Sequence, residues 1–311
     1  MSVVSPVYGC KGCLEELVDG IAMAVGPAGH SYEVILVDDN SPDSAWPRIV
    51  ELAQTRHWLR GIRLSRNFGQ HYAIAAGIEQ TRGDTVVVMD CDLQDPPEEI
   101  PKLVARLHEG FDVVFAQRTD RQDNWLKRFN SWAFFRLLSW LTGVQQDHTT
   151  ANFGAYSRKV IDVINAMPER DRCFPLMVKW TGFAATNVPV NHAARQNGQS
   201  GYSFRKLVRL ATEIVLSYSD KPLRLVVRVG LSFAAIAFAM VAWTLFRFFE
   251  GDTQVAGFTS VIASIWLVGG VIISCLGILG LYLGRLFVDA KRRPYYLISE
   301  QTRSEETQDG N

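Results

Sequence analysis

Short apolar runs alternate with amphipathic stretches along the first 116 residues of the chain. Five runs rich in Val, Ile and Leu predict strands at residues 2–8, 32–37, 60–64, 85–88 and 112–116. Four stretches between them carry apolar residues at helical spacing and predict helices at residues 14–25, 45–54, 72–79 and 98–109. Within residues 72–79, small residues such as Ala73 and Gly77 favour close packing on a sheet. Regular alternation of strands and helices indicates an α/β fold, with a mostly parallel sheet covered by helices on both faces.

Two much longer apolar runs follow in the last third of the chain. Residues 229–246 and residues 253–284 contain no charged side chain. A membrane-spanning helix needs about 20 apolar residues, so each run predicts one span, with Arg247 reaching toward the interface. Buried core helices are the alternative, but each run is longer than a core helix requires. Glycines at positions 269, 270, 277, 280 and 284 are typical of close helix contact in lipid.

Basic residues flank the two apolar runs on one side only. Lys221, Arg224 and Arg228 precede the first run, and Arg285, Lys291, Arg292 and Arg293 follow the second. The connection at residues 250–257 has neither Lys nor Arg. Because basic residues stay on the cytoplasmic side, we expect both chain ends in the cytoplasm and the short connection outside. The predicted location is therefore the cytoplasmic (inner) membrane, as a multi-pass protein without a signal peptide.

Two further stretches, residues 125–141 and 203–218, combine Lys and Arg with aromatic side chains at helical spacing. Such helices suit a membrane surface, with ordinary packing on the α/β core as the alternative. The polar residues 299–311 are expected to be disordered. We therefore divide the chain into an α/β domain (1–202), a juxtamembrane amphipathic helix (203–224), a two-helix transmembrane region (225–290) and a basic and polar cytoplasmic tail (291–311).

Charge and cysteine content narrow the possible functions. The 32 basic and 32 acidic residues cancel, so no overall field favours nucleic acid as a partner. Of the five cysteines, Cys10 and Cys13 have CxxC spacing, but no second pair completes a zinc site. We interpret them as two incidental thiols, with a redox pair as the alternative. The predicted cytoplasmic location makes a structural disulfide unexpected.

Polar residues follow each of the predicted strands. Asp90 and Asp92 come directly after residues 85–88, and their hard carboxylate oxygens suit Mg²⁺ or Mn²⁺ arriving with substrate phosphates. The alternative is a turn in which the aspartates bond their own backbone. Similar polar groups end the other strands: Pro6 and Tyr8, Asp38 and Asp39, residues 65–67, and Gln117 with Arg118. In parallel sheets ligands bind beyond the carboxyl ends of the strands, so these residues predict one site.

The types of residue at this edge suggest a nucleotide-activated donor. Asp38 or Asp39 could accept a hydrogen bond from a base N–H, Tyr8 could pack on the base, and Arg118 could pair with phosphate oxygens. Membrane spans nearby suggest an acceptor carried by a lipid. The combination predicts transfer of a group from a nucleotide diphosphate to a lipid.

Five motifs carry a resemblance to a known family. They are Ser-Pro-Val-Tyr at residues 5–8, Val-Asp-Asp-Asn-Ser at 37–41, Leu-Ser-Arg-Asn-Phe-Gly at 64–69, Asp-Cys-Asp-Leu-Gln-Asp-Pro-Pro at 90–97 and Arg-Gln-Asn-Gly-Gln-Ser-Gly-Tyr at 195–202. Together they resemble family 2 glycosyltransferases, and most closely the dolichol-phosphate mannose synthase group with its bacterial polyprenyl-phosphate relatives. The resemblance runs from about residue 2 to residue 230.

The resemblance implies a GT-A fold and transfer of a sugar, with inversion at C1, from a nucleotide-diphosphate sugar to a polyprenyl (undecaprenyl or dolichyl-type) phosphate for cell-surface glycans. It places the metal, Mg²⁺ or Mn²⁺, at Asp90, Asp92 and Gln94. It places the nucleotide sugar near Pro6, Tyr8, Asp38, Asp39, Arg66 and Asp90, and the donor and acceptor phosphates near Arg118, Arg195 and Ser200. The catalytic set that it implies is Asp92, Arg118 and Asn152. Association into a homo-oligomer is suggested by the glycines of the apolar runs.

The chain departs from the family pattern in two places. Gly9 and Cys10 follow Tyr8 where the family usually has Asn-Glu, which leaves the base preference open. Residues 151–154 are Ala-Asn-Phe-Gly where many bacterial relatives have Gly-Asp-Phe-Arg, so Asn152 stands in place of a carboxylate proposed as general base. Asp147 is a possible substitute.

Two alternatives remain open at this point. A glycosyltransferase with a non-lipid acceptor would not need the amphipathic segments. A non-catalytic nucleotide-binding membrane scaffold would not need the Asp-x-Asp-x-Gln motif at residues 90–94. A processive polysaccharide synthase is disfavoured because the sequence has no Gln-x-x-Arg-Trp motif.

Overall fold

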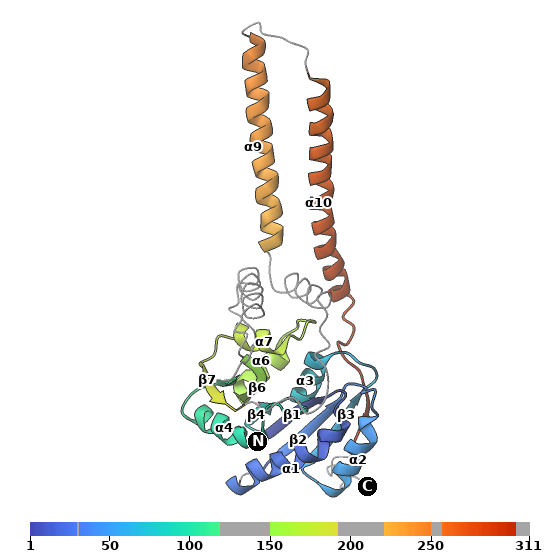
Figure 1. Ribbon diagram of the computed structural model, residues 1–311, viewed down its shortest axis with the longest axis vertical. Coiled ribbons are helices and arrows are strands. Elements are labelled where there is room, and N and C mark those ends of the chain that lie inside the picture. Colours follow the sequence, from blue (N-terminus) through green and yellow to red (C-terminus); the bar gives the residue numbers. More distant parts are fainter. Residues whose placement is uncertain (30, 119–149, 192–220, 250–256, 303–311) are drawn as a thin grey trace. The chain divides into compact units, whose positions relative to one another are not determined.

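The computed structural model describes residues 1–29, 31–118, 150–191, 221–249 and 257–302 (Figure 1). The chain forms two compact units. One contains Met1–Arg136, Val144–Gly201 and Pro294–Asn311, and the other contains Leu137–Gly143 and Tyr202–Arg293.

The first unit is built on an eight-stranded sheet with the order β7-β5-β6-β4-β1-β2-β3-β8. Its strands are β1 (Ser2–Val7), β2 (Glu33–Asp38), β3 (Leu59–Leu64), β4 (Thr85–Val88), β5 (Val113–Arg118), β6 (Thr150–Ser157), β7 (Ala185–Val190) and β8 (Ile298–Gln301). Strands β1 to β4 are parallel to one another. Strand β6 is antiparallel to both β4 and β5, so β5 runs in the same direction as β4. The predicted mostly parallel sheet is confirmed.

Helices cover both faces of this sheet, as the alternation predicts (Figure 1). One face packs against α1 (Leu14–Val25), α2 (Ala45–Thr55) and α4 (Ile100–His108). The other packs against α3 (Gln70–Glu79), α6 (Arg158–Ala166) and α7 (Phe174–Trp180). Successive residues of β1 point to opposite faces, so Val3 belongs to the first cluster and Val4 to the second. The predicted bounds of α1 and β4 match, and those of the other strands and helices predicted before residue 118 differ by at most two residues at an end.

Helix α3 packs on the sheet more closely than a larger side chain would allow. A Cβ atom at Gly77 would lie 2.3 Å from Val4 Cγ1 and 3.1 Å from Val37 Cγ2. Ala73 and Ala76 on the same helix are fully buried. The predicted small-residue face of α3 is therefore its contact with β1 and β2, and this contact places the first residue of α3 beside the strand ends.

The end of the chain differs from its prediction. Residues 298–301 form β8, which pairs antiparallel with β3, so the expectation that disorder begins at residue 299 is wrong. Strand β3 would otherwise be an edge with unpaired backbone groups, and β8 satisfies them. Disorder was expected because these residues are polar. They are polar because a strand at the edge of a sheet exposes most of its side chains.

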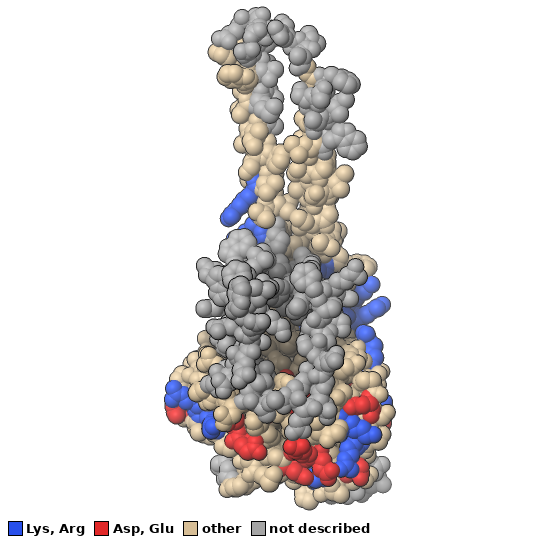
Figure 2. Space-filling model, viewed as in Figure 1, with Lys and Arg blue, Asp and Glu red and all other residues tan. Residues whose placement is uncertain are grey.

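The second unit contains two long helices, α9 (Lys221–Phe249) and α10 (Phe258–Ala290). Among the described residues, one segment is long and apolar enough to cross a membrane: Leu267–Ala290 in α10, with mean hydropathy 2.2. The charged side chains of these helices lie near their ends, and residues 229–246 and 258–284 carry none, so the described surface there is tan in Figure 2. One apolar helix of spanning length is thus found, and the second predicted span stays a prediction. The predicted amphipathic segments 125–141 and 203–218 lie outside the described residues.

Candidate active site

The carboxyl ends of β1 to β5 lie at one edge of the sheet. Pairing of Val7 with Asp38 and of Asp38 with Arg63 aligns the first three strand ends. Strand β6 runs the opposite way, and its first residue, Thr150, pairs with Gln117. Asn152, the third residue of β6, therefore lies near the edge of the sheet where β4 and β5 end. The fold thus brings five predicted site residues to one edge of the sheet: Tyr8, Asp38, Asp90, Arg118 and Asn152.

The loops after β1 and β2 are joined by hydrogen bonds. The backbone N–H of Gly9 donates to Ser41 Oγ at 2.7 Å, and that of Lys11 donates to Asp43 Oδ2 at 2.8 Å. The N–H of Ser41 in turn donates to Asp38 Oδ1 at 2.8 Å. Tyr8 is 54% exposed at this junction, so its ring is available to a ligand. Pro6, by contrast, is buried within β1.

Asp39 holds the loop that follows β3. Its two carboxylate oxygens accept the backbone N–H groups of Phe68 at 2.7 Å and Gly69 at 2.8 Å. These donors directly precede α3, where a negative charge is favoured by the helix dipole. Burial raises the pKa of Asp39, although both hydrogen bonds oppose this. The sequence suggested only a ligand contact for Asp39, and the tertiary structure adds this role in fixing the loop.

Arg66 lies in the loop held by Asp39. Its side chain is exposed, and its guanidinium lies 4.3 Å from the centre of the Phe68 ring. Stacking of this kind leaves the N–H groups at the rim of the guanidinium available to an anion. The predicted position of Arg66 at the ligand edge is consistent with this geometry.

The loop after β4 carries Asp90, Asp92 and Gln94, all half-buried. Gln70 Nε2, from the first residue of α3, donates to Asp90 Oδ1 at 2.6 Å. Asp92 Oδ1 accepts the N–H of Gln94 at 3.2 Å, which is the turn geometry considered as the alternative. One carboxylate oxygen is thus used locally, and a carboxylate still has lone pairs to offer. The turn and the metal-binding interpretation are compatible.

The donor set in this loop fits a hard divalent cation. Asp90, Asp92 and Gln94 offer two carboxylates and an amide oxygen within five residues. No group of three or more His, Cys, Asp or Glu side chains suited to a metal occurs in the part of the chain that the structure describes. A pair of carboxylates is what Mg²⁺ commonly takes from a protein when substrate phosphates and water complete its shell. We conclude that the residues present fit such an ion.

A disulfide joins Cys10 to Cys91, with the two Cα atoms 6.4 Å apart. It links the loop after β1 to the Asp90–Asp92 loop, because β1 and β4 are neighbours in the sheet. Cys13 is a free, buried thiol whose pKa is raised by burial, then by Glu16 and Asp92. The interpretation of Cys10 as an incidental thiol and the expectation of no structural disulfide are therefore wrong. The partners are 81 residues apart, which the CxxC spacing could not indicate.

The remaining predicted residues are placed only in part. Arg118 is the last residue of β5, at the site edge. Asn152 is half-buried in β6. Two residues on, a Cβ atom at Gly154 would lie 2.9 Å from the Val114 carbonyl oxygen, so this position has no space for a larger residue. Arg195, Ser200 and Asp147 lie outside the described residues.

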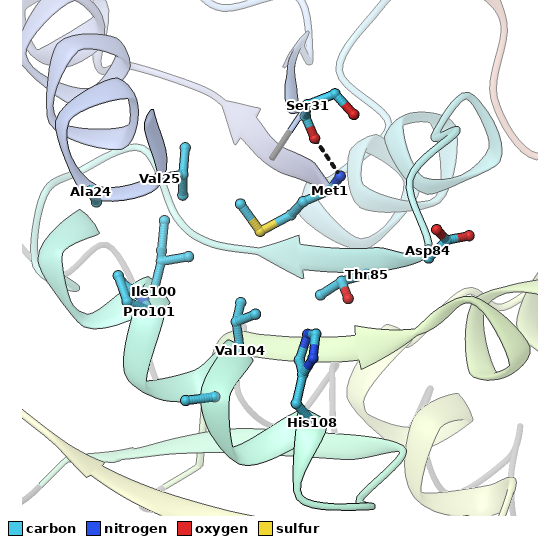
Figure 3. Close-up of a pocket in the computed structure, with 11 residues that line it drawn as sticks. Met1, Ala24, Val25, Ser31, Asp84, Thr85, Ile100, Pro101, Val104 and His108 are labelled. Atoms are coloured by element: carbon cyan, nitrogen blue, oxygen red, sulfur yellow. Dashed lines mark hydrogen bonds between the residues drawn. The ribbon is translucent and has the colours of Figure 1, made fainter. Parts of the chain in front are cut away.

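A cavity of about 480 Å³ lies at the opposite edge of the sheet (Figure 3). Its lining includes Met1, Thr85, Ile100, Val104 and His108. Met1 precedes β1 and Thr85 begins β4, so the cavity is at the amino ends of the strands. The Met1 amino group donates to the Ser31 carbonyl oxygen at 2.9 Å across its rim. This cavity is not part of the candidate active site.

His71, next to Gln70 on α3, should make the stability of the fold sensitive to acid. Burial lowers its pKa to about 4, and its Nε2 lies 3.8 Å from Cys173 Sγ. Burial raises the pKa of Cys173 to about 11, so this thiol stays neutral in acid. The unfolded chain has an ordinary histidine pKa of about 6.5 and therefore binds a proton that the folded chain does not. The stability from neutral His71 is present above pH 6.5 and is lost as the pH falls toward 4.

We expect the free energy of unfolding of detergent-solubilised protein to fall by about 2 kcal/mol between pH 7 and pH 4.5 because of His71. Urea titration of wild type and His71→Gln measures this share, and the variant should lose less stability than wild type over that interval. His108→Gln, which changes an exposed histidine, is the matched control. Equal pH dependence in His71→Gln and wild type would contradict the assignment.

Comparison with known proteins covers both units of the chain. The model of glycosyl transferase family 2 matches residues 2–164, and the model of the GtrB C-terminal hairpin matches residues 221–286. An uncharacterized glycosyltransferase from Synechocystis sp. (strain ATCC 27184 / PCC 6803 / Kazusa) is 33% identical over 301 residues, covering 96% of this chain and 95% of the relative.

Solved structures with a similar arrangement are more distant. Glucosyl-3-phosphoglycerate synthase from Mycobacterium tuberculosis, in complex with Mn²⁺, uridine-diphosphate and glucosyl-3-phosphoglycerate, has a TM-score of 0.48 and 19% identity, covering 70% of this chain and 77% of the synthase. S. aureus TarS 1-349 in complex with UDP-GlcNAc has a TM-score of 0.46 and 18% identity, covering 70% of this chain and 67% of TarS.

The family match spans the strand ends that carry the candidate site, and the relative matches almost the whole chain. The chain therefore belongs to glycosyl transferase family 2, as a glycosyltransferase with a GT-A-type α/β fold and a GtrB-type C-terminal hairpin.

Proposed function

We propose that this glycosyltransferase moves a sugar from a nucleotide-diphosphate sugar to a polyprenyl phosphate at the cytoplasmic face of a membrane. The observation that carries the proposal is the pairing of a family 2 domain with a GtrB-type hairpin, because GtrB is a polyprenyl-phosphate glycosyltransferase. The apolar segment of α10 supports a membrane-borne acceptor. Basic residues at both outer ends of the hairpin favour the cytoplasmic side.

The donor is assigned to the loops at the site edge. The nucleoside is assigned to Tyr8, Asp38 and Asp39, with Pro6 supporting the strand end. Arg66 and Arg118 are assigned to the phosphates, because guanidinium groups pair well with phosphate oxygens. Asp90, Asp92 and Gln94 are assigned to Mg²⁺ or Mn²⁺, which when bound neutralises the diphosphate as it leaves.

The acceptor needs positioning more than activation. An oxygen of the polyprenyl phosphate attacks C1 of the sugar while the bond from C1 to the donor diphosphate breaks, and the nucleoside diphosphate leaves with the electron pair. Configuration at C1 inverts. A phosphate monoester already carries negative charge near pH 7, so no side chain has to remove a proton. The amide of Asn152 is sufficient to orient the acceptor, and Arg195 and Ser200 are assigned to the phosphate of the acceptor.

Lipid extraction tests this proposal directly. Membranes containing the protein are incubated with a panel of radiolabelled nucleotide sugars, polyprenyl phosphate and Mn²⁺ or Mg²⁺. We expect label from one donor in the organic phase, released as free sugar by mild acid, and none after chelation by EDTA. Label that stays in the aqueous or protein fraction would identify a non-lipid acceptor and contradict the proposal. Labelled lipid formed equally well in EDTA would contradict the metal assignment.

A further inference from the structure

The C-terminal strand β8 reaches the candidate nucleotide site through one side chain. Glu300 lies opposite Arg63 in the pairing of β8 with β3, and Arg63 lies opposite Asp38 in the pairing of β3 with β2. Arg63 Nη1 donates to Glu300 Oε1 at 2.6 Å, and Arg63 Nε lies 3.6 Å from Asp38 Oδ2. The three charged groups therefore form a row across three adjacent strands, ending at the predicted nucleoside contact.

Glu300 is itself held in place. Its second oxygen, Oε2, accepts the indole N–H of Trp46 at 2.9 Å. The strand around it is fixed at both ends, since Ser65 N donates to the Leu297 carbonyl at 2.8 Å and Thr302 N donates to the Gly61 carbonyl at 3.0 Å. The Glu300 carboxylate accepts hydrogen bonds from two donors and lies on an ordered strand, so its side chain is already restricted to few rotamers. Glu300 is therefore a fixed point for the Arg63 guanidinium.

The exposure of the three side chains decreases along the row from Glu300 to Asp38. The side chain of Glu300 is 51% exposed, that of Arg63 is 35% exposed and that of Asp38 is 2% exposed. A buried carboxylate needs a nearby cation to stay charged, whereas a long, partly exposed arginine side chain readily turns to water. Glu300 prevents that movement by engaging one end of the guanidinium while Nε faces Asp38.

We propose that Glu300 is a positioning residue for the donor nucleotide, acting through Arg63 on the carboxylate of Asp38. The inference rests on the proposed function, because it takes Asp38 as a nucleoside contact. The chemistry recognised is the hydroxyl or N–H donor of a nucleoside diphosphate, which pairs best with an ionised Asp38. The C-terminal segment after the hairpin thus completes the donor site, in addition to covering an edge strand.

The charged groups around Asp38 agree with this role. Burial raises its pKa, the Ser41 N–H and Arg63 lower it, and Asp43 and Glu300 raise it again, in that order of size. Asp39 is its immediate neighbour in the chain. Because Arg63 affects Asp38 more strongly than Glu300 does, losing the placement of Arg63 outweighs losing the repulsion from Glu300. Without Glu300 the protonation of Asp38 moves to higher pH.

Glu300→Gln is the test variant, because the amide keeps the size and acceptor oxygen but loses the charge. With the donor found active in the nucleotide-sugar panel, we expect KM for that donor to rise about fivefold with kcat unchanged. The rise of KM at acidic pH should begin at higher pH than in wild type. Glu51→Gln, which removes an exposed glutamate paired with Arg48 on α2 at 2.6 Å, is the matched control and should leave KM unchanged.

A double-mutant cycle separates positioning from a general loss of structure. Arg63→Gln should raise KM at least as much as Glu300→Gln, and the double variant should be no worse than Arg63→Gln alone. Additive effects, or wild-type KM in Glu300→Gln, would overturn the inference. Binding of UDP and GDP to the detergent-solubilised variants is measured in parallel, without acceptor. Weaker nucleotide binding in Glu300→Gln with no lipid product from wild type would support the inference while rejecting the proposed function.

Discussion

Replacing Asp92 with Asn should lower the rate of sugar transfer by about three orders of magnitude, a loss of about 4 kcal/mol of transition-state stabilisation. The change removes one negative charge from the loop that fits a divalent cation, so the cation would bind more weakly and the departing diphosphate would lose the positive charge that neutralises it. The fold should persist, because an asparagine Oδ1 can still accept the Gln94 N–H that Asp92 Oδ1 accepts at 3.2 Å. Initial rates at saturating Mn²⁺ measure the effect, with thermal unfolding as the check on structure.

Asp19→Asn is the matched control for Asp92→Asn. Asp19 is a half-buried carboxylate on α1 that pairs with Arg56 at 2.7 Å, so its loss removes a charge without touching the site loops. We expect this variant to keep wild-type activity. Calorimetry of Mn²⁺ binding in the presence of a nucleoside diphosphate gives a second readout. This binding should be weaker in Asp92→Asn and unchanged in Asp19→Asn. Activity of Asp92→Asn within tenfold of wild type would remove Asp92 from the metal site.

Replacing Cys10 with Ser should destabilise the oxidised protein by up to about 4 kcal/mol, because its disulfide with Cys91 joins positions 81 residues apart. A link across a long stretch of chain removes much conformational freedom from the unfolded state. Urea titration of protein purified without reductant measures the loss. In excess dithiothreitol, wild type and Cys10→Ser should have similar stability, because the Cys10–Cys91 disulfide is then absent from both.

Cys13→Ser is the matched control for the disulfide, because Cys13 is buried, lies three residues from Cys10 and is a free thiol. It should keep the stability difference between oxidised and reduced protein. Counting accessible thiols with a maleimide reagent in denaturant gives an independent result. We expect three free thiols in oxidised wild type and five after reduction, matching the three free cysteines and the one disulfide. Five thiols in protein purified and air-oxidised without reductant would contradict the link.

Hydrophobic periodicity was a good guide to the elements before residue 118. Strands such as β1 and β4 are buried on both faces, so their apolar character is continuous and easily seen in the sequence. The helix predicted at residues 14–25 matches α1, because its buried residues recur at helical spacing. By contrast, β6, α6, α7 and β7 were not among the predicted elements. Strand β6 includes Gly154 and polar residues such as Asn152, which obscure its pattern.

The candidate site shows the same division between local and long-range information. Asp90, Asp92 and Gln94 stand within five residues, so their shared loop could be inferred from the sequence. The contact of Asp39 with Phe68 and Gly69 could not, because each partner is some 30 residues away. Any carboxylate after a strand can contact a ligand or a loop, and only the packed structure distinguishes the two uses.

The sequence by itself determined the α/β class, the family, the order of elements along the first 118 residues and the apolar C-terminal helices, because each depends on residues close together in the chain. Tertiary structure decided where β6 enters the sheet, that Cys10 pairs with Cys91 and not with Cys13, and that the polar residues 298–301 form β8 beside β3. These outcomes depend on which strands become neighbours. That choice is made by burying both faces of the sheet and satisfying its edge, and neither condition is visible in a local stretch of sequence.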